Sequence, residues 1–136
     1  MRKVSVFLGL CMLTGLILTV FGQQEGLPPI MQSARTTVGS LNMNLMAKNA
    51  SGATQDAEKI QMLYTQAGDI FKALKAQDAV DFAKMQVDDA AAVVQAVKAN
   101  DFDAATGRAK SIQARCGMCH MAHREQLPDK TFRFKP

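Results

Sequence analysis

The stretch that decides the fold is residues 101–128, DFDAATGRAKSIQARCGMCHMAHREQLP. Mostly small and apolar residues recur along this stretch in alternating steps of three and four. They are Phe102, Ala105, Ala109, Ile112, Cys116, Cys119 and His123. Such spacing keeps one face of an α-helix turned toward a core. Asn100 or Asp101 can cap the start of this helix, and Leu127–Pro128 is expected to end it. The stretch therefore predicts a long amphipathic helix with two cysteines on its core-facing stripe.

Three more helices are expected before it. The first starts near Pro28–Pro29, the second near Thr54, and the third after a turn at residues 75–78, where Asp78 can cap it. Because that turn contains neither Gly nor Pro, one unbroken helix through it is the alternative. Short turns between four amphipathic helices predict an all-α, antiparallel up-down-up-down four-helix bundle. The basic tail at residues 130–136 is expected to pack loosely or not at all.

Residues 116–120, CGMCH, read C-x-x-C-H, which is the attachment signature of a c-type haem. Cys116, Cys119 and His120 stand at positions i, i+3 and i+4, so they share one helix face. The thiols can form two thioether bonds with the haem vinyl groups, and His120 can supply its imidazole to the iron. A zinc site that also recruits His123 is disfavoured, because four ligands within two turns of one helix cannot easily surround a tetrahedral ion. One covalent haem c is the expected cofactor.

The first 22 residues have the layout of a secretory signal peptide. A positive head, MRK, precedes an almost wholly apolar run from Val4 to Val20, and cleavage is expected after Gly22. Residues 23–136 would then form the mature domain, although an uncleaved membrane anchor is the alternative. Cys11 would leave with the signal. Because bacterial thioether attachment follows export, a periplasmic location agrees with the motif.

The charge pattern limits the classes of partner. Loss of Arg2 and Lys3 with the signal lowers the formal net charge from +4 to +2, and no basic stripe with interleaved aromatics is present. Nucleic acid is therefore not an expected partner. No nucleophile triad, phosphate loop or catalytic carboxylate pair stands out, so an enzyme is not expected either. Redox proteins or a small gas ligand are the expected partners, without stable membrane insertion once the signal is removed, and a homodimer stays open.

Residues 96–125, AVKANDFDAATGRAKSIQARCGMCHMAHRE, resemble the last helix of the cytochrome c′ family, the class II c-type cytochromes. The resemblance rests on the turn at residues 98–103, the spacing to C-x-x-C-H and Arg124 four residues after His120. It extends more loosely back to about residue 28, and it departs from the family at His123, where an aromatic residue is common. The resemblance implies a four-helix bundle with covalent haem near the C-terminus. Some members bind nitric oxide or carbon monoxide at five-coordinate iron, and others carry a methionine ligand and transfer electrons.

Electron transfer is the expected function, because a single haem in a small exported domain is the one chemical constellation that the chain offers. Binding of nitric oxide or carbon monoxide at five-coordinate iron is the alternative. Beside the haem, Arg124 can contact a propionate through a charge-assisted hydrogen bond. An ordinary solvated arginine is the other interpretation of this residue.

The sixth iron ligand decides between the two functions. His120 lies about two turns before Leu127, so antiparallel packing places the matching height of the first helix near residues 35–38. That window contains no methionine, and Val38 offers only methyl groups. The height comparison predicts five-coordinate iron under an apolar wall, with Met31 as the leading candidate if a sixth ligand exists.

Overall fold

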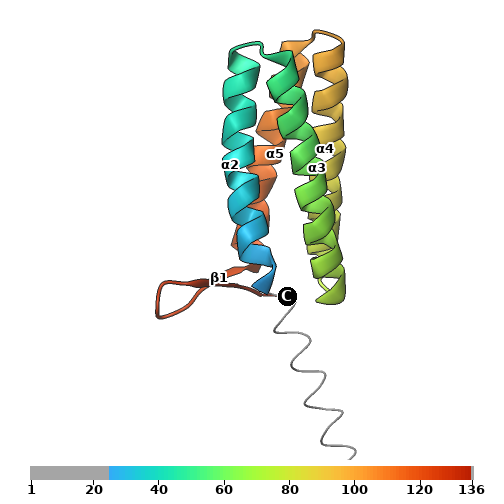
Figure 1. Ribbon diagram of the computed structural model, residues 1–136. Helices are drawn as coiled ribbons and strands as arrows, with labels where there is room; N and C mark the ends of the chain where they lie inside the picture. Colours follow the sequence, from blue (N-terminus) through green and yellow to red (C-terminus); the bar gives the residue numbers. More distant parts are fainter. Residues whose placement is uncertain (1–24, 136) are drawn as a thin grey trace, which may run out of the picture.

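The computed structural model describes residues 25–135, so the predicted signal peptide at residues 1–22 lies outside the described residues. Four long helices make up most of this part: α2 (Leu27–Met46), α3 (Ala50–Ala73), α4 (Gln77–Lys98) and α5 (Phe102–His123). They run alternately up and down, each packs against the next, and α2 also packs against α5 (Figure 1). The predicted all-α four-helix bundle is confirmed. None of the helices between residues 25 and 135 has the length and apolar character of a membrane span.

The three turns between the helices share one backbone feature, a residue in the left-handed conformation. Each contains a non-glycine residue with a positive φ, namely Lys48 (53°), Lys75 (59°) and Asn100 (57°). At the second turn the Lys75 N–H donates to the Lys72 carbonyl at 3.0 Å, and the Ala76 N–H donates to the Phe71 carbonyl at 3.0 Å. This pair of bonds is the Schellman motif, which satisfies carbonyls left open at a helix end. It ends α3 without Gly or Pro, so the alternative of one unbroken helix is wrong.

We expect Lys75→Gly to stabilise the fold by about 0.5–1 kcal/mol. The left-handed conformation costs an L-residue roughly 1–2 kcal/mol, and glycine avoids that cost while losing more backbone entropy on folding. Lys72→Gly, in the last turn of α3, is the matched control and should destabilise by about 1 kcal/mol. Urea unfolding of both variants checks the opposite signs, and destabilisation by both would contradict the role of the Lys75 backbone.

The helix starts differ in part from expectation. α3 begins at Ala50, earlier than predicted, because the Asn49 side chain accepts a hydrogen bond from the Gly52 N–H at 3.2 Å and caps the helix there. Asp78 lies in the first turn of α4 rather than at the capping position. Asp101 caps α5, as predicted.

The core consists mainly of small side chains. Its largest fully buried side chains are one from each helix: Leu41, Ile60, Val93 and Ile112. Alanines fill much of the remaining core and allow the helices to approach closely. On α5, no residue between Ile112 and His123 is buried, and the stripe positions there hold the half-buried Cys116 and Cys119. Since cysteines are too small to fill an inter-helix space, this end of the bundle is where room for a ligand remains.

The chain leaves α5 at His123 rather than at Leu127, so the predicted helix end is wrong. It forms the strand β1 (Arg124–Gln126), turns, and returns as β2 (Phe132–Phe134), which pairs antiparallel with β1. The expectation of a loosely packed tail is also wrong, because Phe134 is half-buried and its ring stacks on Phe71 at a centroid distance of 5.0 Å. This hairpin lies at the end of the bundle where α2 begins and α5 ends (Figure 1).

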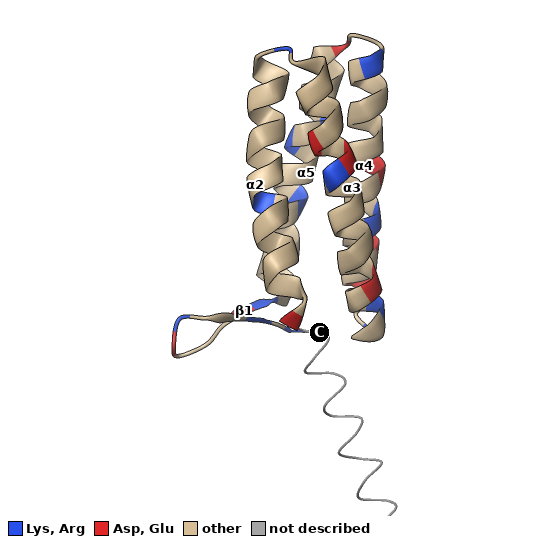
Figure 2. Ribbon diagram, in the orientation of Figure 1, with Lys and Arg blue, Asp and Glu red and all other residues tan. Residues whose placement is uncertain are grey.

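Charged residues of both signs are interspersed over the helices and the hairpin (Figure 2). Positive residues are not gathered into a stripe in the part of the chain drawn in colour.

Candidate functional site

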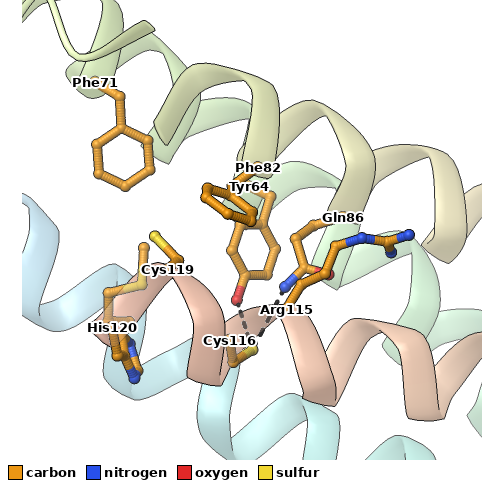
Figure 3. A pocket seen from close by; sticks show the side chains of 9 residues that line it. Tyr64, Phe71, Phe82, Gln86, Arg115, Cys116, Cys119 and His120 are labelled. Atoms are coloured by element: carbon orange, nitrogen blue, oxygen red, sulfur yellow. Dashed lines mark hydrogen bonds between the residues drawn. The ribbon is translucent and has the colours of Figure 1, made fainter. Parts of the chain in front are cut away.

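A pocket lies at the hairpin end of the bundle, and all four helices contribute to its lining (Figure 3). The lining residues are Met31 from α2, Tyr64 and Phe71 from α3, Phe82 and Gln86 from α4, and Arg115, Cys116, Cys119 and His120 from α5. The three residues singled out by the C-x-x-C-H motif therefore face one cavity. Met31, from the other end of the sequence, faces it as well.

The Cys116 sulfur is held at the inner wall. Its Sγ lies 3.3 Å from the Tyr64 hydroxyl and 3.4 Å from Gln86 Nε2, and Gln86 Nε2 also donates to the Ile112 carbonyl at 3.1 Å. Burial, and then the neighbouring Cys116, raises the pKa of Tyr64 well above its usual range. The phenol therefore stays protonated, and its O–H can donate a hydrogen bond to the Cys116 sulfur.

Cys119 and His120 are both electrically neutral side chains at pH 7. Burial raises the pKa of the Cys119 thiol to about 11, with smaller contributions from Cys116 and Asp78. Burial, followed by the positive charge of Arg124, lowers the pKa of His120. A neutral imidazole has a nitrogen lone pair available for a metal ion. In Figure 3 the Cys119 side chain extends toward Phe71, whereas the His120 ring points away from Phe71.

Met31 lines the same pocket as His120, whereas none of residues 35–38 does. It is half-buried on α2 and lines the pocket, whereas Val38 belongs to the buried core. The expected height assumed that α5 ends at Leu127, whereas the helix ends at His123, one turn after His120. The matching position on the antiparallel α2 therefore shifts toward its start, to the turn that holds Met31.

Arg124 and His123 do not line this pocket. The Arg124 guanidinium carbon lies 3.4 Å above the centroid of the Phe132 ring, in a cation–π contact within the hairpin. His123 is buried, and its Nε2 lies 3.0 Å from Asp78 Oδ2. The zinc alternative thereby loses a ligand, since both ring nitrogens of His123 already have protein partners, Asp78 and the Lys135 carbonyl.

Sequence reasoning missed the polar residues of α4 that support the site. Asp89 is almost completely buried, and it pairs with Arg115, which lines the pocket, and with Arg108 at 3.3 Å. Gln86, one turn earlier, is only 2% exposed. The available signal was a polar pair, Gln86 and Asp89, three residues apart on the same face as the buried alanines. Buried polar groups of this kind are normally present to meet a specific partner.

The residues present fit a covalently attached haem. Both cysteines, His120 and Met31 line the cavity, and Phe71 and Phe82 give it apolar walls. The buried Gln86 Oε1 has no hydrogen-bond partner among residues 25–135, so the wall still has an acceptor to offer. A pocket with aromatic walls and a few placed donors is the usual form of a cofactor site.

Comparison with known proteins gives no relative for this chain. No protein-family model, no curated protein and no solved structure matches it. The functional argument therefore rests on the residues of the pocket.

Proposed function

We propose that this chain is an exported c-type cytochrome, similar to the cytochrome c′ family, that carries one covalent haem and transfers single electrons. The observation that carries the proposal is the shared pocket of Cys116, Cys119, His120 and Met31. Three of these residues lie within the short stretch 116–120, but Met31 reaches the same cavity only because α2 and α5 pack against each other (Figure 1).

Each residue has a separate role in the proposal. Cys116 and Cys119 hold the haem through thioethers, and each bond forms as the S–H adds across a vinyl group, sulfur to one carbon and hydrogen to the other. His120 would supply a nitrogen ligand and Met31 a sulfur ligand to the iron. A haem bound here would supply a one-electron couple, whose potential would depend on the residues that ligate it and on burial. Phe71 and Phe82 exclude water from the site.

Met31 favours electron transfer over gas binding. With both His120 and Met31 as ligands, the iron would have no open position for carbon monoxide or nitric oxide. Five-coordinate iron stays the alternative, since Met31 is half-buried and a thioether is a weak ligand.

The test is production of the full chain in a host that attaches haem c, followed by absorption spectroscopy and acid–acetone extraction. We expect a c-type pyridine haemochrome spectrum that stays with the precipitated protein. Haem released into the extract would show non-covalent binding. A protein without a Soret band would overturn the proposal.

A further inference from the structure

The ring of His123 has an unusual set of partners for a buried histidine. His123 is only 6% exposed and is the last residue of α5. Its Nδ1 lies 2.8 Å from the Lys135 carbonyl oxygen and its Nε2 lies 3.0 Å from Asp78 Oδ2. A carbonyl oxygen and an ionised carboxylate are both acceptors, whereas a neutral imidazole has a single N–H to donate. Both contacts are satisfied together only when the ring carries a proton on each nitrogen.

The same ring ties the C-terminal strand to the bundle. The Lys135 N–H donates to the His123 carbonyl at 2.7 Å, so these two residues exchange two hydrogen bonds. The Phe134 ring stacks on His123 and on Phe71, with centroid distances of 5.0 Å in both cases. Phe71 is itself a wall of the pocket. The contacts form a continuous path from Asp78, through His123 and Phe134, to the cavity.

We propose that residues 124–135 form a strap that the His123 imidazolium, paired with Asp78, holds closed against Phe71 at the end of the pocket. Loss of one ring proton leaves a nitrogen lone pair facing an acceptor, which releases the Lys135 carbonyl or the Asp78 carboxylate and loosens the strap. The inference goes beyond the proposed function, because the strap closes on protein groups alone.

Among residues 25–135, Asp78 is the acid recorded in an ion pair with the His123 ring. Asp78 on α4 supplies the negative charge, and α3 supplies the uncharged Phe71, which stacks on Phe134. The exposed residue Lys135, directly after β2, supplies its backbone carbonyl. On α5 itself, Cys119 lies one turn earlier and close enough to Asp78 for that charge to act on it. Asp78 is thus the anion that pairs with the ring.

Two variants separate stacking from hydrogen bonding in the full chain. His123→Phe keeps a ring against Phe134 but removes the two hydrogen bonds of the imidazole nitrogens, to Asp78 and to the Lys135 carbonyl. Asp78→Ala removes the carboxylate. Asp103→Ala is the matched control, since Asp103 is an exposed acid in the first turn of α5, at the opposite end of the bundle. We expect both strap variants to exchange the Lys135 amide hydrogen about tenfold faster than the parent, as loss of hydrogen bonds to a charged group requires, and the control to match the parent.

A direct readout is the nitrogen-15 NMR spectrum of the His123 ring, which should show both nitrogens protonated. As the pH rises, the Phe134 ring-proton shifts should move together with the loss of that signature, and in His123→Phe they should not. A neutral His123 ring in the closed strap would overturn the proposal, and so would parent-like exchange in His123→Phe. If His123→Phe fails to fold, the comparison of Asp78→Ala with Asp103→Ala decides. None of these readouts needs haem, so failure of the strap and failure of the proposed cytochrome function are distinguishable.

Discussion

Protein in which both Cys116 and Cys119 are replaced by alanine should contain no haem that survives acid–acetone extraction. The thioether bonds are the covalent link, and no third cysteine lies in residues 25–135 to replace them. Each single alanine variant keeps one thiol in the pocket and should retain less haem than the parent. The measurement is the pyridine haemochrome spectrum of the precipitated protein, scaled to protein concentration.

Met118→Ala is the control for this pair. Met118 lies between the two cysteines in the sequence and is 51% exposed, so its loss changes the motif stretch without removing a pocket residue. It should retain haem as the parent does. Extraction-resistant haem in the double cysteine variant would remove Cys116 and Cys119 from their proposed role.

Met31→Ala should open the iron to carbon monoxide and convert a low-spin haem to a high-spin one. In the parent, the Met31 sulfur is expected to compete with external ligands. If the Met-off form is about 1–10% populated, removal of the sulfur raises the apparent carbon monoxide affinity roughly 10- to 100-fold. The optical spectrum of the oxidised parent should show the methionine-to-iron charge-transfer band, and the variant should lack it.

Met43→Ala is the matched control, because Met43 is on the same helix but is 67% exposed and does not line the pocket. Its spectra and carbon monoxide affinity should match those of the parent. A parent protein that is already high-spin, with an affinity equal to that of Met31→Ala, would favour the five-coordinate, gas-binding alternative.

The sequence predicted the helices and the cysteine motif because both are local patterns. Steps of three and four along residues 102–123 are enough to define a helix face, and positions i, i+3 and i+4 bring Cys116, Cys119 and His120 onto one side of it. The buried residues Ala105, Ala109 and Ile112 follow that stripe. The all-α bundle follows from four such faces joined by short turns.

Helix ends were less predictable, because they depend on backbone bonds that leave little trace in residue type. The turn at Lys75 closes through Schellman hydrogen bonds with a lysine in the left-handed conformation, where glycine would have been the readable signal. The end of α5 at His123 depends on the hairpin, and the hairpin depends on contacts of Phe134 and Lys135 with residues far away in the chain.

By itself, the sequence determined the fold class, the amphipathic faces and the placement of two thiols and an imidazole on one helix. Only the tertiary structure decided that Met31 and Gln86 line the pocket, that Asp89 pairs with Arg115, and that His123 packs against Asp78 and Phe134. The physical reason is that helical periodicity is set within a few residues. The height at which two antiparallel helices meet is instead set by where each of them ends, and for α5 that point is decided by packing against the rest of the bundle.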